Sequence, residues 1–126
     1  MTRALLALVL AGCIGVGHPS KNEVIASVGR ETKYKSPITK ATFDGNLVVI
    51  ELGARVRLVI ASCYAHAQQK IGDHDHFTVT FDGKDAKSGE LDIADCITKH
   101  VTASLTATSA DGVKLEAAID TDLVKP

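Results

Sequence analysis

Alternation of apolar and polar residues is the feature that most constrains the fold of this 126-residue chain. In residues 101–108, Val, Ala, Leu and Ala alternate with Thr, Ser, Thr and Thr, and residues 77–82 and 113–120 follow the same pattern. Successive side chains of a β-strand point to opposite faces of the sheet, so this pattern indicates strands with one buried and one solvated face. If these segments were helices, their apolar residues would not gather on one face that could be buried. We therefore expect mainly antiparallel β-structure.

Asp-Gly pairs stand where these strands must turn. The pair Asp111-Gly112 lies between two alternating segments and predicts a hairpin, because Asp-Gly supplies the positive φ that a tight primed turn requires. The sequences Asp44-Gly45-Asn46 and Asp82-Gly83-Lys84 predict two further turns in the same way.

The most apolar stretch after the N-terminal region runs from Leu47 to Ile60. Its β-branched residues, and the alternation of Arg55 and Arg57 with apolar neighbours, favour two strands or one strand bent at Gly53. Residues 62–71 are rich in Ala and Gln and lack alternation, which predicts one short helix. The turn spacing predicts an all-β fold, a small antiparallel β-sandwich or barrel of about seven or eight strands.

Composition excludes several classes of protein. The chain has 14 Lys and Arg against 15 Asp and Glu, and this balance gives no reason to expect a nucleic-acid partner. Apolar residues make up 45% of the chain, which excludes disorder over most of its length. No apolar run approaches the roughly 20 residues of a membrane-spanning helix, so a polytopic membrane protein is excluded.

The N-terminal region has the three parts of an export signal. Arg3 supplies a positive charge, Ala4 to Leu10 are apolar, and the small residues Ala11 and Gly12 precede Cys13. The end of this segment, Leu10-Ala11-Gly12-Cys13, resembles the lipobox of bacterial lipoprotein precursors.

The resemblance implies a lipid-anchored protein. Residues 1–12 would be a signal peptide, and the mature chain would begin at Cys13 with acyl chains such as palmitate attached to it. Several acyl chains hold a protein at a bilayer stably, whereas one chain gives marginal binding. In Gram-negative bacteria, Ile14 in place of Asp after the cysteine implies the outer membrane rather than the inner membrane.

A short linker is expected between the anchor and the folded domain. Residues 13–22 contain Gly, Pro, Ser and Asn without an apolar period, which is typical of a flexible tether. The remainder, residues 23–126, is expected to form a single β domain. The C-terminal half is similar in style to small β-rich lipoproteins of unassigned role.

Cys63 and Cys96 remain when Cys13 is lipidated. Two cysteines in an oxidising compartment predict one disulfide. They are 33 positions apart. A loop of about this length contributes roughly 3–4 kcal/mol in the chain-entropy model. The alternatives are a pair of buried free thiols and thiolate ligands of a metal.

A histidine cluster gives a second hypothesis. In the sequence Asp73-His74-Asp75-His76, an extended backbone places His74 and His76 on one face. With a third donor from His66 or His100, and Cys63 as a further candidate, these side chains match the ligands of Zn²⁺ or Cu²⁺. The alternatives are a solvated polar loop and a pH-sensitive contact.

Enzymatic activity is not expected. The chain has no Gly-x-Ser-x-Gly or Ser-x-x-Lys sequence, and the carboxylate pairs Asp92/Asp95 and Asp120/Asp122 are interpreted as solvated charges. We expect a lipid-anchored cell-envelope protein without a cofactor, acting as a non-catalytic binding or structural module on a protein partner that the sequence does not identify. The alternative is a periplasmic metal-binding module that uses the histidine cluster.

Overall fold

The computed structural model describes residues 18–45, 47–61, 67–71, 77–97 and 99–126. In these ranges the chain forms ten β-strands and no helix. The strands are β2 (Glu23–Val28), β3 (Glu31–Pro37), β4 (Lys40–Asp44), β5 (Leu47–Leu52), β6 (Val56–Ile60), β7 (Ala67–Lys70), β8 (Phe77–Phe81), β9 (Lys84–Ile97), β10 (His100–Ser109) and β11 (Lys114–Asp122).

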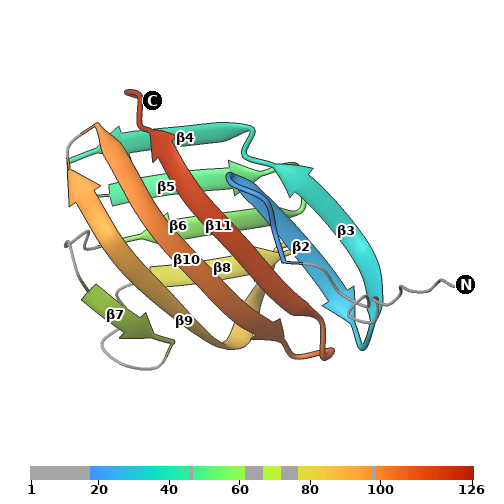
Figure 1. Ribbon diagram of the computed structural model, residues 1–126. Helices are drawn as coiled ribbons and strands as arrows, with labels where there is room; N and C mark the ends of the chain where they lie inside the picture. The colour runs from blue at the N-terminus through green and yellow to red at the C-terminus, as the bar shows by residue number, and fades with distance from the viewer. Residues whose placement is uncertain (1–17, 46, 62–66, 72–76, 98) are drawn as a thin grey trace, which may run out of the picture.

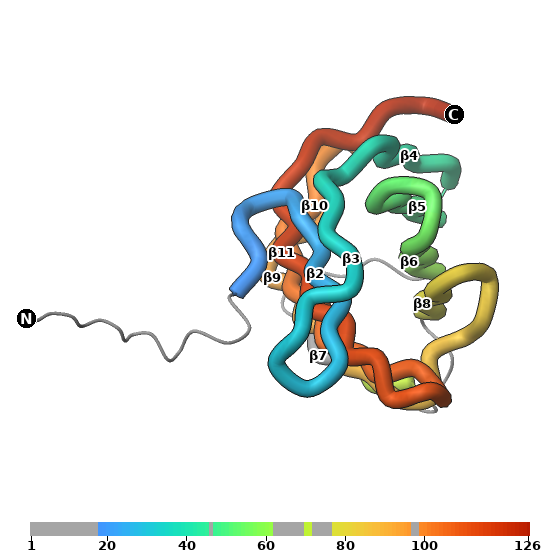
Figure 2. Tube along the Cα trace, turned by 90° about the vertical axis from the view of Figure 1, so that its right-hand side faces the viewer, coloured from blue at the N-terminus to red at the C-terminus, as the bar shows by residue number. Residues whose placement is uncertain are grey.

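One curled sheet contains most of these strands. Its hydrogen-bonded order is β11-β10-β9-β8-β6-β5-β4, with β7 paired to β9 beside this path, and β2 and β3 form a separate hairpin. The sheet curls so that β9, β10 and β11 lie across the core from β4, β5, β6 and β8 (Figures 1 and 2). The all-β prediction of a barrel or sandwich is therefore confirmed, with more strands than the seven or eight expected.

Strand β9 carries the chain from one layer to the other. Its first residues, Lys84 and Asp85, pair with β8, whereas its remaining length pairs with β10. The β9–β10 register shifts twice, between the partners of Thr102 and Ala103 and between those of Thr108 and Ser109. Such bulges bend a strand and increase its local twist, which lets one long strand turn the corner of the sheet.

Segments from both ends of the described chain cover the outer strands. Val124 forms a parallel bridge with Thr42 of β4, where the Phe43 N–H donates to the Val124 carbonyl over 2.9 Å. At the opposite edge, Lys21 forms a parallel bridge with Ala118 of β11, and β2 packs beside it. These contacts partly satisfy backbone groups that an open sheet edge would expose.

Inward-facing residues form an aliphatic core. On β10 and β11, the alternating apolar side chains predicted to face inward are buried, with Val113 partly buried at the end of the row. The buried members are Val101, Ala103, Leu105, Ala107, Leu115, Ala117 and Ile119. The alternating segment 77–82 behaves similarly, since Phe77 and Val79 are buried.

The helix predicted near residues 62–71 is wrong where the structure describes that segment. Ala67–Lys70 form β7, which pairs antiparallel with Glu90–Ile93 of β9. Helix propensity is a weak preference, and here pairing with the backbone edge of β9 overrides it. Residues 62–66 lie outside the described ranges.

The predicted turns are present, although one differs in detail. Asp82 and Gly83 both have positive φ, at 55° and 80°, as a primed two-residue turn requires. At the β10–β11 hairpin only Gly112 has positive φ, and its N–H donates to the Ser109 carbonyl over 3.0 Å. The connection there is a three-residue loop, in which a turn is followed by a left-handed glycine.

The apolar stretch from Leu47 to Ile60 forms two strands that turn at Gly53, as predicted. Gly53 has a φ of +73°, and a Cβ built on it would lie 1.8 Å from the Tyr34 hydroxyl oxygen. That hydroxyl donates to the Leu52 carbonyl over 3.0 Å, which fastens β3 to the β5–β6 turn. Only a glycine therefore allows β3 to approach the turn this closely.

Arg55, in the β5–β6 turn, contacts strand β3, the end of β8 and the β8–β9 turn. Its guanidinium carbon lies 5.1 Å from the Tyr34 ring centroid and 4.7 Å from that of Phe81. The same group donates to both carboxylate oxygens of Asp82, over 2.7 Å each. A planar guanidinium satisfies both sets of contacts, because its edge pairs with the carboxylate while its faces lie on the rings.

Candidate functional site

The register of β10 and β11 brings a histidine and two aspartates together on the outer face of the sheet. His100 lies opposite Asp122, and Thr102 lies opposite Asp120. Directly opposite residues in an antiparallel pair project from the same face, and diagonal neighbours are still within reach of long side chains. His100 therefore faces Asp122 across the strands and Asp120 along the diagonal.

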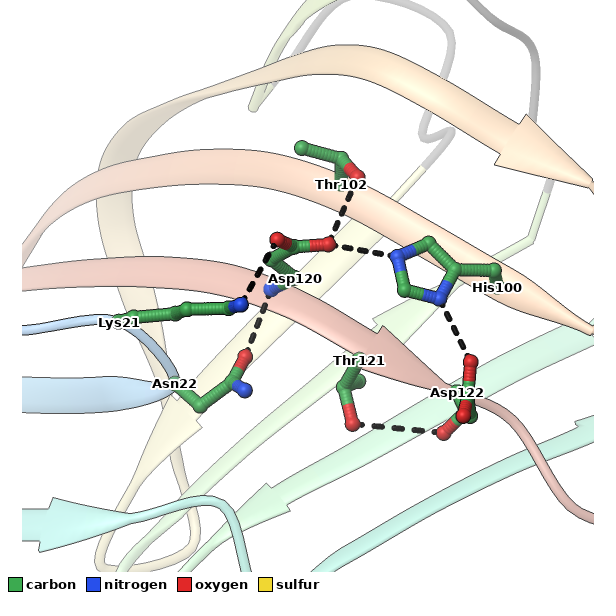
Figure 3. Close-up of polar contacts among 7 residues, drawn as sticks. All are labelled: Lys21, Asn22, His100, Thr102, Asp120, Thr121 and Asp122. Carbon is green, nitrogen blue, oxygen red and sulfur yellow. Dashed lines mark hydrogen bonds and ion pairs between the residues drawn. The ribbon is translucent and has the colours of Figure 1, made fainter.

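Both ring nitrogens of His100 contact carboxylates (Figure 3). The distance from Nδ1 to Asp122 Oδ1 is 2.7 Å, and that from Nε2 to Asp120 Oδ1 is 2.6 Å. An ionised carboxylate only accepts hydrogen bonds, so both contacts are satisfied when each nitrogen carries a proton. The geometry thus favours the imidazolium cation.

Asp120 is the centre of a larger polar cluster, which we define as Lys21, Asn22, His100, Thr102, Asp120 and Asp122. The Thr102 hydroxyl donates to Asp120 Oδ1 over 3.2 Å, and Lys21 Nζ lies 3.3 Å from Oδ2. The backbone N–H of Asp120 donates to Asn22 Oδ1 over 2.7 Å. The cluster therefore fastens the segment that precedes β2 to the outer face of β11.

Charge in the polar cluster is balanced. Hydrogen bonds to Asp122 and then Asp120 raise the pKa of His100 above its ordinary value. The hydrogen bond from His100, followed by that from Lys21, lowers the pKa of Asp120. The partial exposure of these side chains to water limits the strength of each pair.

This arrangement holds the segment that precedes β2 against β11. An imidazolium has no lone pair with which to accept a proton or to bind a metal ion. His100 was a candidate third metal donor, but here both of its nitrogens are engaged with carboxylates. The carboxylates of Asp120 and Asp122, interpreted from the sequence as solvated charges, are 39% and 87% exposed, and both also contact His100.

Most of the residues predicted as sites lie outside the described ranges. These are the lipidation residue Cys13, the disulfide residue Cys63 and the metal candidates His66, His74 and His76. Cys96 is half-buried near the end of β9, in register with Val101 of β10. The Cys63–Cys96 disulfide and the histidine metal site therefore stay predictions.

Neither a metal-binding group nor a membrane-spanning helix is found in the part of the chain that the structure describes. Within the described ranges, no group of three or more His, Cys, Asp and Glu side chains is arranged to hold a metal ion. That same part of the chain contains no helix that is long and apolar enough to span a membrane.

A hollow of about 730 Å³ lies at the corner of the sheet where β4 ends and β10 begins. Its lining includes Phe43 of β4, Lys99 before β10, and the segment from Leu123 to Pro126. We call this the corner hollow. None of its residues was predicted as a site residue from the sequence, because they come from three segments that only the fold brings together.

Lys21 and Asn22 were also missed, since they belong to the predicted tether. The signal that could have indicated Asn22 is its residue type. Its φ is +60°, a conformation that asparagine adopts more readily than most residues.

Comparison of the chain with protein-family models, with curated proteins and with solved structures gives no match.

Proposed function

We propose that this chain is an exported, lipid-anchored protein of the cell envelope, whose β domain is a non-catalytic binding module held close to the membrane. The lipobox-like residues at Cys13 support the anchor. The observation that carries the proposal is the docking of Lys21 and Asn22 on β11. This docking fixes the point at which a chain anchored at Cys13 enters the folded domain.

The length of chain between anchor and docking point limits how far the domain can stand from the bilayer. Lys21 follows Cys13 by eight residues. A fully extended segment of that length spans at most about 29 Å, which is about the diameter of a small domain. A fixed entry point with a short tether restricts both the distance and the orientation of the domain, so the same parts of its surface would face the envelope.

The binding role is supported by a cavity built on fixed backbone. Small-molecule sites are commonly concave, of about 300–1,000 Å³, and found at the mouths of β-barrels. The corner hollow, at about 730 Å³, has this size and lies at an end of the curled sheet. His100, whose two ring nitrogens both contact carboxylates, serves instead to hold the polar cluster.

The anchor is tested by expressing the full chain in a Gram-negative host fed with labelled palmitate. The expected product begins at Cys13, carries label and fractionates with the outer membrane. Cys13→Ser should abolish the labelling and leave the precursor uncleaved. Ile14→Asp is the matched control, since it should leave acylation intact and shift the protein to the inner membrane. An unlabelled wild-type chain that retains residues 1–12 would overturn the proposal.

The metal-binding alternative is an outcome of a second measurement. Native mass spectrometry of the exported protein with and without Zn²⁺ separates the two functions. Stoichiometric zinc that is retained by the wild type and lost in His74→Ala/His76→Ala would favour a metal-binding module. A mass two hydrogens below the reduced value, without retained zinc, would instead indicate the Cys63–Cys96 disulfide and remove zinc from consideration.

A further inference from the structure

The corner hollow has walls that are fixed by backbone hydrogen bonds. The Val124 N–H donates to the Ala41 carbonyl over 3.1 Å, and the Phe43 N–H donates to the Val124 carbonyl over 2.9 Å. On the other side, the Leu123 N–H donates to the Lys99 carbonyl over 2.7 Å. Because these bonds fasten the C-terminal segment to both β4 and the start of β10, the hollow exists before any ligand enters.

The corner hollow exposes large apolar side chains of a kind that proteins normally bury. The Val124 side chain is exposed over 61% of its surface, beside the partly buried ring of Phe43. A shallow groove of about 250 Å³ continues the hollow across the outer face of β4 and β5, and it is lined by Leu47, which is 42% exposed. Of the three large apolar side chains exposed in the described part of the chain, two therefore lie along this one depression.

The rim of the corner hollow is cationic. Lys99 and Lys125 line it, and neither forms an ion pair with any residue that the structure describes. Asp44 is the acidic side chain in the lining, so the side chains that line the hollow carry one positive charge in excess. Along the adjoining groove, Asp44 and Glu51 balance Lys40 and Arg57. An apolar floor with unpaired ammonium groups at its edge is complementary to a molecule that has an alkyl chain and an anionic head.

We propose that the corner hollow binds a single long-chain carboxylate, with the alkyl chain against Phe43 and Val124 and the carboxylate between Lys99 and Lys125. The volume suits one small molecule, and the lining comes from three segments around a depression rather than from a flat patch that would lie on a bilayer. This inference rests on the proposed binding role and names its ligand class, but it does not depend on acylation of Cys13.

The test is an NMR titration of the full chain carrying Cys13→Ser, so that no lipid of its own competes. The probes are octanoate, octan-1-ol and octylammonium, which share one chain length and differ in head-group charge. We expect saturable one-to-one binding of octanoate, with shifts of the Lys99, Leu123 and Val124 amides. Octan-1-ol should bind about tenfold more weakly, because it keeps the apolar contact and loses the charge-assisted contacts.

Reversing the charge of Lys99 and Lys125 distinguishes a specific binding site from nonspecific electrostatic attraction. Lys99→Glu/Lys125→Glu should weaken octanoate binding at least about tenfold and reverse the preference toward octylammonium. The matched control is Lys87→Glu/Lys114→Glu, which makes the same change in net charge at exposed lysines outside the hollow and should leave the affinity unchanged. Val124→Ser keeps the backbone bonds and should weaken octanoate and octan-1-ol equally.

Three results would overturn the proposal. The first is equal affinity for octanoate and octan-1-ol that charge reversal does not alter. The second is a set of shifts confined to residues outside the hollow. The third is sedimentation with phosphatidylglycerol vesicles without saturable binding of octanoate, which would make this face a membrane contact. None of these results bears on the acylation of Cys13. A failure of the proposed ligand can therefore be distinguished from a failure of the proposed lipid-anchored module.

Discussion

Replacing Gly53 by Ala tests the closest approach of two segments in the fold. The new residue would have to keep a left-handed backbone at φ +73°, which costs about 1–2 kcal/mol for a residue with a Cβ. The methyl group would also lie 1.8 Å from the Tyr34 hydroxyl, so that hydroxyl must move away. Breaking its hydrogen bond to the Leu52 carbonyl adds about 1–2 kcal/mol. The free energy of unfolding should therefore fall by about 2–4 kcal/mol.

Gly29→Ala is the matched control for the backbone contribution. Gly29 has a similar φ of +60°, and a Cβ there would meet nothing within 4 Å. Its substitution should cost only the conformational part, about 1–2 kcal/mol. Urea denaturation of the full chain carrying Cys13→Ser measures both values, and an unchanged m-value shows that the substitution does not alter the surface exposed on unfolding.

A double-mutant cycle with Tyr34→Phe isolates the steric part. Removing the hydroxyl oxygen removes the nearest atom that the new methyl group displaces and leaves Ser36 Oγ, at 2.6 Å from the new Cβ. Gly53→Ala should therefore cost less in the Tyr34→Phe background than in the wild type. Equal costs for Gly53→Ala and Gly29→Ala, together with strict additivity in the cycle, would refute the argument that β3 requires a glycine at this turn.

Three further predictions concern polar contacts. The raised pKa of His100 stabilises the fold fully below the unfolded value of about 6.5, and this contribution is lost as pH rises through the folded pKa. In NMR titrations the His100 midpoint should lie above that value and fall in Asp120→Asn. Arg55→Lys should lower the urea midpoint more than Arg57→Lys, because a lysine cannot pair through two nitrogens while lying on two rings. Asn22→Gly keeps the positive φ but should speed hydrogen exchange at the Asp120 amide, whose acceptor it removes.

Much of the β10–β11 pairing could be deduced from the sequence. Residues that lie directly opposite each other share a face, so the odd-numbered apolar residues of 101–107 must pair with the odd-numbered residues of 113–119. A two-residue loop at Asp111-Gly112 would pair Ala110 with Val113, which breaks this match. The three-residue loop keeps it and places His100 opposite Asp122. The alternation was therefore sufficient to predict the register. Interpreting Asp111-Gly112 as a two-residue primed turn led to a different register.

Other features depend on contacts between distant segments and could not be obtained from a local pattern. Asn22 contacts Asp120 across 98 positions, and nothing near either residue indicates the other. Strand β7 has the composition of a helix, and its structure is decided by β9. The corner hollow likewise requires β4, Lys99 and the C-terminal segment to meet, so its ammonium groups are seen in the sequence only as ordinary surface lysines.

The bonds of Asn22 and Val124 also determine when the domain can finish folding. A chain synthesised from its N-terminus exposes β2 first and Val124 almost last, yet Asn22 needs Asp120 and β4 needs Val124. Contacts of such sequence separation are slow to form, because their loop-closure entropy is lost before they contribute stability. Closure of the sheet must therefore wait until Asp120 and Val124 have emerged. Until then the chain remains incompletely folded, which is the state that the proposed export would require.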